Sequence, residues 1–215
     1  MPYSQRQQPT AVLFDWDNTL VDTMPLICGA INQTLAHFGM ESWSEQDIKQ
    51  KTQLSAKDSL PHHFGDRWLE ALTVYRDFYH QNHLKLLTPL PGALLLLKRL
   101  ADNKTPMGVV SNKRGATLRK EVTHLKWDQF FCALIGAGDA AKDKPHPAPA
   151  LLALKTLGME ASSAIWFVGD APVDWQCAEA VGCWPIPVGL GHPEANFYPQ
   201  AVKNCEDLEK ILSKL

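Results

Sequence analysis

Residues 11–20 read Ala-Val-Leu-Phe-Asp-Trp-Asp-Asn-Thr-Leu, and this stretch decides the fold of the chain. Its first four residues, Ala11–Phe14, are apolar and predict a buried β-strand. Two carboxylates follow at once, Asp15 and Asp17, and Asn18 indicates a turn. Because ligands bind at the carboxyl ends of strands in parallel α/β sheets, this acidic strand end is a candidate site.

The spacing of the two aspartates indicates that they act together. Residues i and i+2 of a strand face the same side, so the Asp15 and Asp17 carboxylates should point together and Trp16 should point away. Two like charges that close need a cation or a proton between them. We favour the cation, because oxygen ligands suit a hard ion such as Mg²⁺. The alternative is a solvated turn that Asp and Asn simply initiate.

Composition narrows the class of protein. The chain has 215 residues, 45% of them hydrophobic, and a formal net charge of -2, which suits one core with or without a smaller inserted domain. Without a Lys/Arg stripe or a long apolar run, neither a nucleic-acid partner nor a membrane span is expected. Residues 1–10 are polar and should form a loose tail rather than a secretory signal. Five cysteines with no C-x-x-C pair favour a reducing, cytoplasmic setting.

The rest of the chain alternates between two patterns. Between residues 23 and 88 apolar side chains recur at helical spacing, which predicts a helical insert. Further strands are expected at residues 106–111, 131–136, 164–168 and 183–188, with helices between them. This alternation predicts an α/β fold, a doubly wound parallel sheet of the Rossmann-like kind with right-handed crossovers.

Each later strand also ends in chemically useful residues. Ser111 and Asn112 stand before a helix N-terminus that can hold an anion, although a plain helix cap is the alternative. Lys144 precedes a rigid Pro-His-Pro helix start and could meet a phosphate, although a solvated surface lysine is the alternative. Asp170 lies just before a further expected helix and Asp174 within its first turn, so both can face one ion.

These four groups resemble, in order, the four motifs of the haloacid dehalogenase-like hydrolase superfamily. The D-x-D-x-T motif is Asp15–Thr19, the Ser/Thr motif begins at Ser111, the lysine motif is Lys144-Pro145, and the G-D-x-x-x-D motif is Gly169–Asp174. The resemblance implies an α/β core formed by residues 11–22 and 89–215. It also implies that residues 23–88 form a helical cap, which closes over the substrate and excludes water.

The resemblance also implies roles for the four aspartates. Asp15 would be the nucleophile that becomes an aspartyl phosphate, and Asp17 the general acid and then the general base. Asp15, the backbone carbonyl of Asp17 and Asp170 would hold Mg²⁺, and Asp174 would support the ion directly or through water. Because a halide leaving group needs no proton, the presence of Asp17 favours phosphoryl transfer over dehalogenation.

Ser111, the backbone of Asn112 and Lys144 would neutralise the transferring phosphoryl group. The core resembles phosphoglycolate phosphatases most, through Ser-Asn-Lys at 111–113 and Lys-Pro-His-Pro at 144–147. The expected function is therefore Mg²⁺-dependent hydrolysis of a small phosphate ester.

Other functions stay open. The cap stretch Thr52–Ser55 lacks the Gly and Pro of the phosphoglycolate phosphatase branch, and residues 54–60 look more like β-phosphoglucomutases. Those mutases use a cap histidine where this chain has Ile27, which makes a sugar phosphomutase a minor alternative. A dehalogenase and a regulatory phospho-acceptor are the remaining alternatives.

Overall fold

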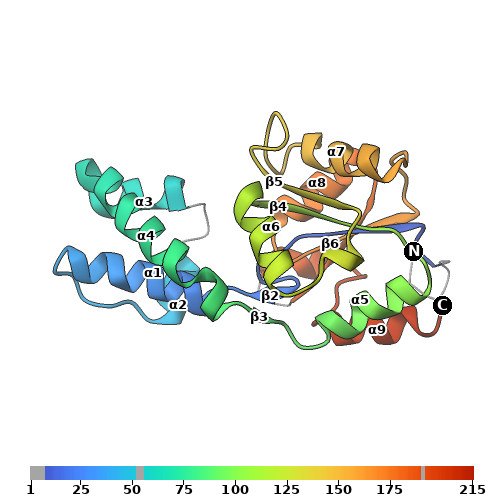
Figure 1. Cartoon of the computed structure of the whole chain (residues 1–215), viewed down its shortest axis with the longest axis horizontal. Coiled ribbons are helices and arrows are strands. Elements are labelled where there is room, and N and C mark those ends of the chain that lie inside the picture. Colours follow the sequence, from blue (N-terminus) through green and yellow to red (C-terminus); the bar gives the residue numbers. More distant parts are fainter. Residues whose placement is uncertain (1–7, 52–55, 190–191) are drawn as a thin grey trace. The chain divides into compact units, whose positions relative to one another are not determined.

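The structure is a computed structural model that describes residues 8–51, 56–189 and 192–215. The chain divides into two compact units (Figure 1). An α/β unit combines the chain up to Asp22 with Pro89–Leu215, and a helical unit comprises Thr23–Thr88. The cap stretch Thr52–Ser55 and most of the expected N-terminal tail lie outside the described residues.

A five-stranded parallel sheet of order β5-β4-β1-β6-β7 forms the α/β unit. Its strands are β1 (Ala11–Phe14), β4 (Met107–Arg114), β5 (Ala133–Ala137), β6 (Ile165–Gly169) and β7 (Trp184–Pro187). β1 lies between β4 and β6, and all of its residues are buried. A strand covered on both faces is apolar throughout rather than alternating. The parallel α/β sheet predicted from the sequence is confirmed.

Helices cover both faces of this sheet. They are α5 (Ala93–Asp102), α6 (Gly115–His124), α7 (Ala148–Leu157), α8 (Pro172–Val181) and α9 (Cys205–Leu212), with short 3₁₀ turns η3 (Asp128–Phe130) and η4 (Pro193–Phe197). Leu154 of α7 and Cys177 of α8 share a buried cluster with Leu13 and Phe167 of the sheet. α5 and α9 contact each other on the opposite side (Figure 1).

β4 is longer than its sequence pattern predicts. The strand continues to Arg114, so Ser111 and Asn112 lie inside it rather than at its end. Its pairing with β5 shifts register between Val110 and Arg114. Such an irregularity bends a strand locally and redirects its side chains. The two polar residues therefore lie within the sheet itself, on β4.

The helical unit consists of α1 (Met24–His37), α2 (Glu45–Lys51), α3 (Ala56–Phe64), the 3₁₀ turn η2 (Gly65–Arg67) and α4 (Trp68–Leu86). It has its own small core of Ile31, Leu35, Ile48, Leu60 and Leu72. A Cβ atom on Gly29 would lie 2.7 Å from the Phe78 ring, so α1 and α4 approach closely because this residue is glycine.

The chain passes between the two units twice, and the two connecting segments pair as β-strands. β2 (Val21–Asp22) and β3 (Thr88–Pro89) form a separate two-stranded sheet.

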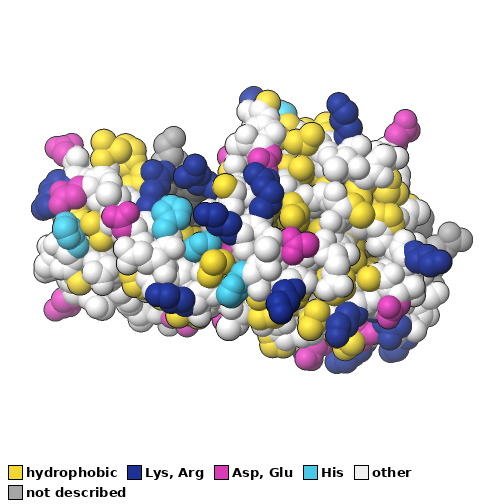
Figure 2. Space-filling view, viewed as in Figure 1, with side chains coloured by type: hydrophobic (Ala, Val, Ile, Leu, Met, Phe, Trp, Pro, Cys, Tyr) yellow, Lys and Arg dark blue, Asp and Glu magenta, His cyan; other side chains and the backbone are white. Residues whose placement is uncertain are grey.

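Among the described residues, we find no helix with the length and apolar character needed to span a membrane. On the face shown in Figure 2, Lys and Arg side chains are mixed with Asp and Glu side chains.

Candidate active site

The candidate site begins where β1 and β6 end side by side. Phe14 pairs with Val168, which brings the next residues of both strands, Asp15 and Gly169, to one edge of the sheet. The backbone N–H of Asp15 donates to the carbonyl of Val168 at 2.8 Å. Asp170 follows directly, so strand pairing alone brings two acidic residues together.

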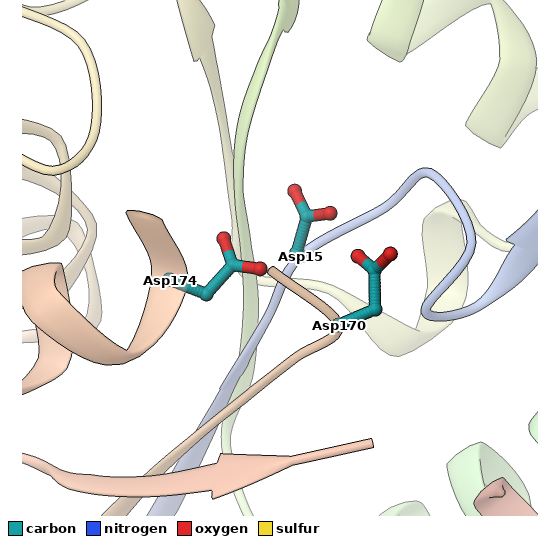
Figure 3. A group of neighbouring side chains, drawn as sticks. All are labelled: Asp15, Asp170 and Asp174. Atoms are coloured by element: carbon teal, nitrogen blue, oxygen red, sulfur yellow. The ribbon is translucent and has the colours of Figure 1, made fainter. Parts of the chain in front are cut away.

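A carboxylate cluster of Asp15, Asp170 and Asp174 lies at this edge (Figure 3). One oxygen atom of each carboxylate lies within 4.8 Å of the other two. Asp174 lies in the first turn of α8, and its side chain accepts the backbone N–H of Ala171 at 3.0 Å. A Cβ atom on Gly169 would lie 2.4 Å from the Asp174 side chain, so glycine is required there. The structure thus brings together three of the four aspartates noted in the sequence.

Lys144 is a fixed cation inside this cluster. Its Nζ lies 2.6 Å from Oδ1 of Asp15 and 2.6 Å from Oδ1 of Asp174, and its side chain is 2% exposed. The alternative of a solvated surface lysine is therefore wrong. Burial favours the neutral amine, but the two carboxylates outweigh this effect and raise the pKa of Lys144. The Asn112 side chain donates to the Lys144 carbonyl and accepts its N–H, both at 2.9 Å, which fixes the lysine loop against β4.

Ser111 lies at the same edge of the sheet as Asp15. β4 pairs with β1 so that Val109 is opposite Phe14, and Ser111 comes two residues further along. The serine is buried, and its Oγ accepts the backbone N–H of Lys113 at 3.3 Å. The described geometry therefore places the hydroxyl inside β4, level with the residues that follow the end of β1.

Negative charge exceeds positive charge in the carboxylate cluster. Burial, followed by the neighbouring carboxylates of Asp174 and Asp15, raises the pKa of Asp170 well above its usual value. Burial also raises the pKa of Asp174 to about 6, although Lys144 opposes this shift. Three closely spaced carboxylates with one ammonium group among them fit a divalent cation. Because all three offer oxygen, they suit Mg²⁺.

Asp17 lies outside the carboxylate cluster and belongs to a second group, which we call the Asp17 ring: Trp16, Asp17, Lys113 and Glu121. Nζ of Lys113 lies 2.6 Å from Oδ1 of Asp17 and 2.6 Å from Oε2 of Glu121. The same Oε2 accepts the indole N–H of Trp16 at 2.7 Å. Burial raises the pKa of Asp17 against the attraction of Lys113. Each aspartate of the pair thus has its own lysine.

This arrangement differs from the single shared cation that the Asp15–Asp17 spacing predicted. β1 ends at Phe14, so strand alternation no longer orients the side chains that follow. Sequence reasoning also did not identify Glu121 as part of the site. Its signal is weak, because a glutamate on an amphipathic helix such as α6 is usually solvated, whereas this one is fully buried.

The comparisons with known proteins agree with this geometry. Residues 12–188 match the sequence profile described as haloacid dehalogenase-like hydrolase. Phosphoglycolate phosphatase 1 of Pseudomonas aeruginosa is 30% identical over 222 residues, covering 96% of this chain and 81% of the relative. Pyrophosphatase PpaX of Bacillus pumilus is 32% identical over 171 residues, covering 80% of this chain and 79% of the relative.

A solved structure gives the same result. The haloacid dehalogenase-superfamily hydrolase from Ehrlichia chaffeensis has a TM-score of 0.70 at 32% identity, covering 98% of this chain and 99% of that chain. The chain belongs to the haloacid dehalogenase-like hydrolase family. The family, the α/β fold and a phosphatase enzyme, all predicted from the sequence, are thereby confirmed.

Proposed function

We propose that this chain is a Mg²⁺-dependent phosphomonoester hydrolase that acts on a small phosphorylated metabolite through an aspartyl-phosphate intermediate. The main support is the contrast between two neighbouring aspartates. Asp15 lies in the carboxylate cluster beside Lys144, whereas Asp17 lies in a separate ring beside Lys113. Two carboxylates in different surroundings can take different roles, here nucleophile and proton donor.

The reaction has two displacements at phosphorus. In the first, an oxygen of Asp15 attacks phosphorus, the bond to the ester oxygen breaks, and Asp17 gives its proton to that oxygen. In the second, water attacks the aspartyl phosphate, Asp17 takes a proton from the water, and the bond between phosphorus and Asp15 breaks. Inorganic phosphate leaves, and both aspartates return to their starting states.

Three groups would bind the phosphoryl oxygens during both steps: the Ser111 hydroxyl, the backbone N–H of Asn112 and the Lys144 ammonium. Two observations support this role for Lys144: its side chain is buried, and the Asn112 side chain fixes its backbone. A cation held in advance needs no reorganisation when charge develops, so it stabilises the transition state more than a mobile one.

Mg²⁺ would be held by Asp15, Asp170 and the backbone carbonyl of Asp17, with Asp174 acting directly or through water. Bound there, the ion supplies positive charge to the phosphoryl oxygens. The charge excess in the carboxylate cluster supports this proposal, since burial and mutual repulsion raise the pKa of Asp170.

Phosphoglycolate is the first candidate substrate, because a relative at 30% identity bears the name phosphoglycolate phosphatase. Pyrophosphate is the second, because a relative at 32% identity bears the name pyrophosphatase. We assign the choice of substrate to the helical unit, Thr23–Thr88, acting as a cap. The cytoplasmic location stays a prediction from the cysteine count.

Phosphate release from a panel of phosphate esters and one phosphoanhydride, pyrophosphate, tests the proposal. The panel contains phosphoglycolate, β-glucose 1-phosphate, nucleoside monophosphates and pyrophosphate, each with Mg²⁺ and with excess EDTA, and the Asp15→Asn variant is the blank. One strongly preferred ester and a loss of activity in EDTA would support it. Full activity in excess EDTA would remove the metal from the proposal. No release from any ester would favour the regulatory phospho-acceptor instead.

A further inference from the structure

The Asp17 ring contains three residues that the chemistry above does not use: Trp16, Lys113 and Glu121. We propose that they are positioning residues that hold the Asp17 carboxylate in the orientation for proton transfer to the leaving group. The inference rests on the proposed function, because it deepens the role given there to Asp17. It concerns side chains of the α/β unit alone.

The contacts of the ring close on themselves. Lys113 bridges Asp17 and Glu121 at 2.6 Å each, and Glu121 returns to the chain by accepting the Trp16 indole N–H at 2.7 Å. Because Trp16 directly precedes Asp17, the backbone completes the circuit. The carboxylate of Asp17 is therefore fixed relative to its own backbone, which a single exposed ion pair does not achieve.

The exposed fractions of the side chains separate three buried members of the ring from one partly exposed member, Asp17. Trp16 and Glu121 are 0% exposed, the Lys113 side chain is 5% exposed, and the Asp17 side chain is 28% exposed. Of these four side chains, Asp17 is the one that a substrate can reach. A buried charge without a partner is strongly destabilising, and here each buried member finds its partner within the ring.

Separate elements hold the ring in place. Lys113 comes from β4, Glu121 from α6, and Trp16 from the segment after β1. The Trp16 indole packs edge to face against Trp127 at 5.8 Å and 80° and against Phe131 at 6.5 Å and 75°. The aromatic side chains of Trp127 and Phe131 fix the direction of the Trp16 N–H, and hence the position of the Glu121 carboxylate.

A purely structural role explains this network poorly. Replacing a buried ion pair by apolar side chains of similar volume is often neutral or stabilising, so ion pairs are weak evidence for stability. Proton transfer, in contrast, requires the donor within hydrogen-bond reach of the leaving oxygen. A ring that constrains one partly exposed carboxylate meets that requirement.

The test compares two kinds of leaving group. An alkyl ester needs a proton from Asp17 as it breaks, whereas 4-nitrophenyl phosphate has a leaving group that is stable as an anion. The ratio kcat/KM reports the steps up to leaving-group departure, so it isolates the first displacement. We expect Lys113→Met to lower kcat/KM about 10²-fold for the best alkyl ester of the panel and less than about 10-fold for 4-nitrophenyl phosphate. Glu121→Gln should also lower kcat/KM more for the alkyl ester than for 4-nitrophenyl phosphate, but by a smaller factor than Lys113→Met.

A second readout follows the second displacement, in which Asp17 acts as the base. If Asp17 is misoriented, the aspartyl phosphate persists after the first leaving group has gone. Rapid mixing of Lys113→Met with 4-nitrophenyl phosphate should then give a burst of 4-nitrophenolate larger than that of the wild type, approaching one equivalent per enzyme. A partly unfolded enzyme would give a smaller burst.

Glu209→Gln is the matched control, because Glu209 is also a buried glutamate, 8% exposed, and pairs with Arg99 away from the ring. It should leave the ratio between the two esters unchanged. Lys113→Arg should recover part of the lost alkyl-ester activity, because the cation is kept. If circular dichroism shows that Lys113→Met does not fold, Glu121→Gln and Trp16→Phe replace it in the test. Their losses of kcat/KM on the alkyl ester and on 4-nitrophenyl phosphate are then compared in the same way.

The outcomes separate the two proposals. Equal losses on both esters, or no loss on either, in the folded ring variants would overturn the positioning role. Phosphate release by the wild type in the same assay would then still support the proposed function. No release from either kind of ester by the wild type would overturn the proposed function and the positioning role together.

Discussion

The carboxylate cluster and the Asp17 ring have similar geometry and differ in the third group that completes each of them. In each, the Nζ of one buried lysine lies 2.6 Å from two carboxylates. The cluster adds a third carboxylate, Asp170, whereas the ring adds the neutral N–H donor of Trp16. The cluster thus has three carboxylates, an oxygen donor set that suits a metal ion, whereas the ring has two carboxylates and is closed by an N–H donor. The same lysine–carboxylate contact therefore belongs to a different kind of site depending on the third group, which is Asp170 in the cluster and Trp16 in the ring.

The largest effect is expected at Asp15. Asp15→Asn removes the nucleophile, and we expect turnover to fall at least about 10⁴-fold, because the loss of a covalent nucleophile removes the intermediate altogether. The amide keeps the size of the side chain, so circular dichroism should show an intact fold. Phosphate release is the measurement. Activity in a folded preparation free of contaminating phosphatase would contradict the assignment.

The two lysines should differ in how their loss depends on the leaving group. Lys144→Met should lower kcat/KM about 10²- to 10³-fold for alkyl and 4-nitrophenyl esters alike, because Lys144 would bind the phosphoryl oxygens rather than the leaving oxygen. It should also cost about 3–5 kcal/mol of unfolding free energy, since buried carboxylates lose their partner. Steady-state kinetics and urea unfolding measure both. A strong leaving-group dependence in Lys144→Met would remove the distinction between cluster and ring.

The excess charge of the cluster predicts a pH effect in the metal-free protein. The pKa of Asp174 rises from 3.8 to about 6 on folding, so between these values the folded state binds more protons than the unfolded state. The free energy of unfolding should therefore fall as pH rises from about 4 to about 6, by about 3 kcal/mol at most.

Urea unfolding in EDTA measures this effect, with Asp174→Asn as the control that cannot titrate at this position. The wild type should lose stability relative to the variant across that pH range. Identical pH profiles for the two proteins would show that the Asp174 carboxyl titrates near its usual value.

The smallest effect is expected at an exposed pair. Lys210 Nζ lies 3.3 Å from Asp207 Oδ1, and the lysine side chain is 64% exposed. Lys210→Ala should change the free energy of unfolding by less than about 0.5 kcal/mol, because solvent screens such pairs, and kcat/KM should not change. Thermal unfolding and the two-ester assay check this. A loss as large as that of Lys144→Met would show that burial is not what separates these ion pairs.

The sequence predicted the sheet and most of the residues at its edge. Apolar runs such as Ala11–Phe14 identified buried strands, and the polar residues that follow them identified Asp15 and Asp170. These inferences succeed because strand formation and turn chemistry depend on short stretches of chain. The parallel topology then places the strand ends at one edge.

The tertiary structure alone decided which charges pair. The sequence predicted one cation for both Asp15 and Asp17, but β1 ends before them and each meets a different lysine. It also left Lys144 open as a surface residue and gave no sign of Glu121, which lies 105 positions from its partner Trp16. The sequence by itself thus determined which chemical groups reach the sheet edge. Their partners depended on long-range packing and burial, which local pattern does not encode.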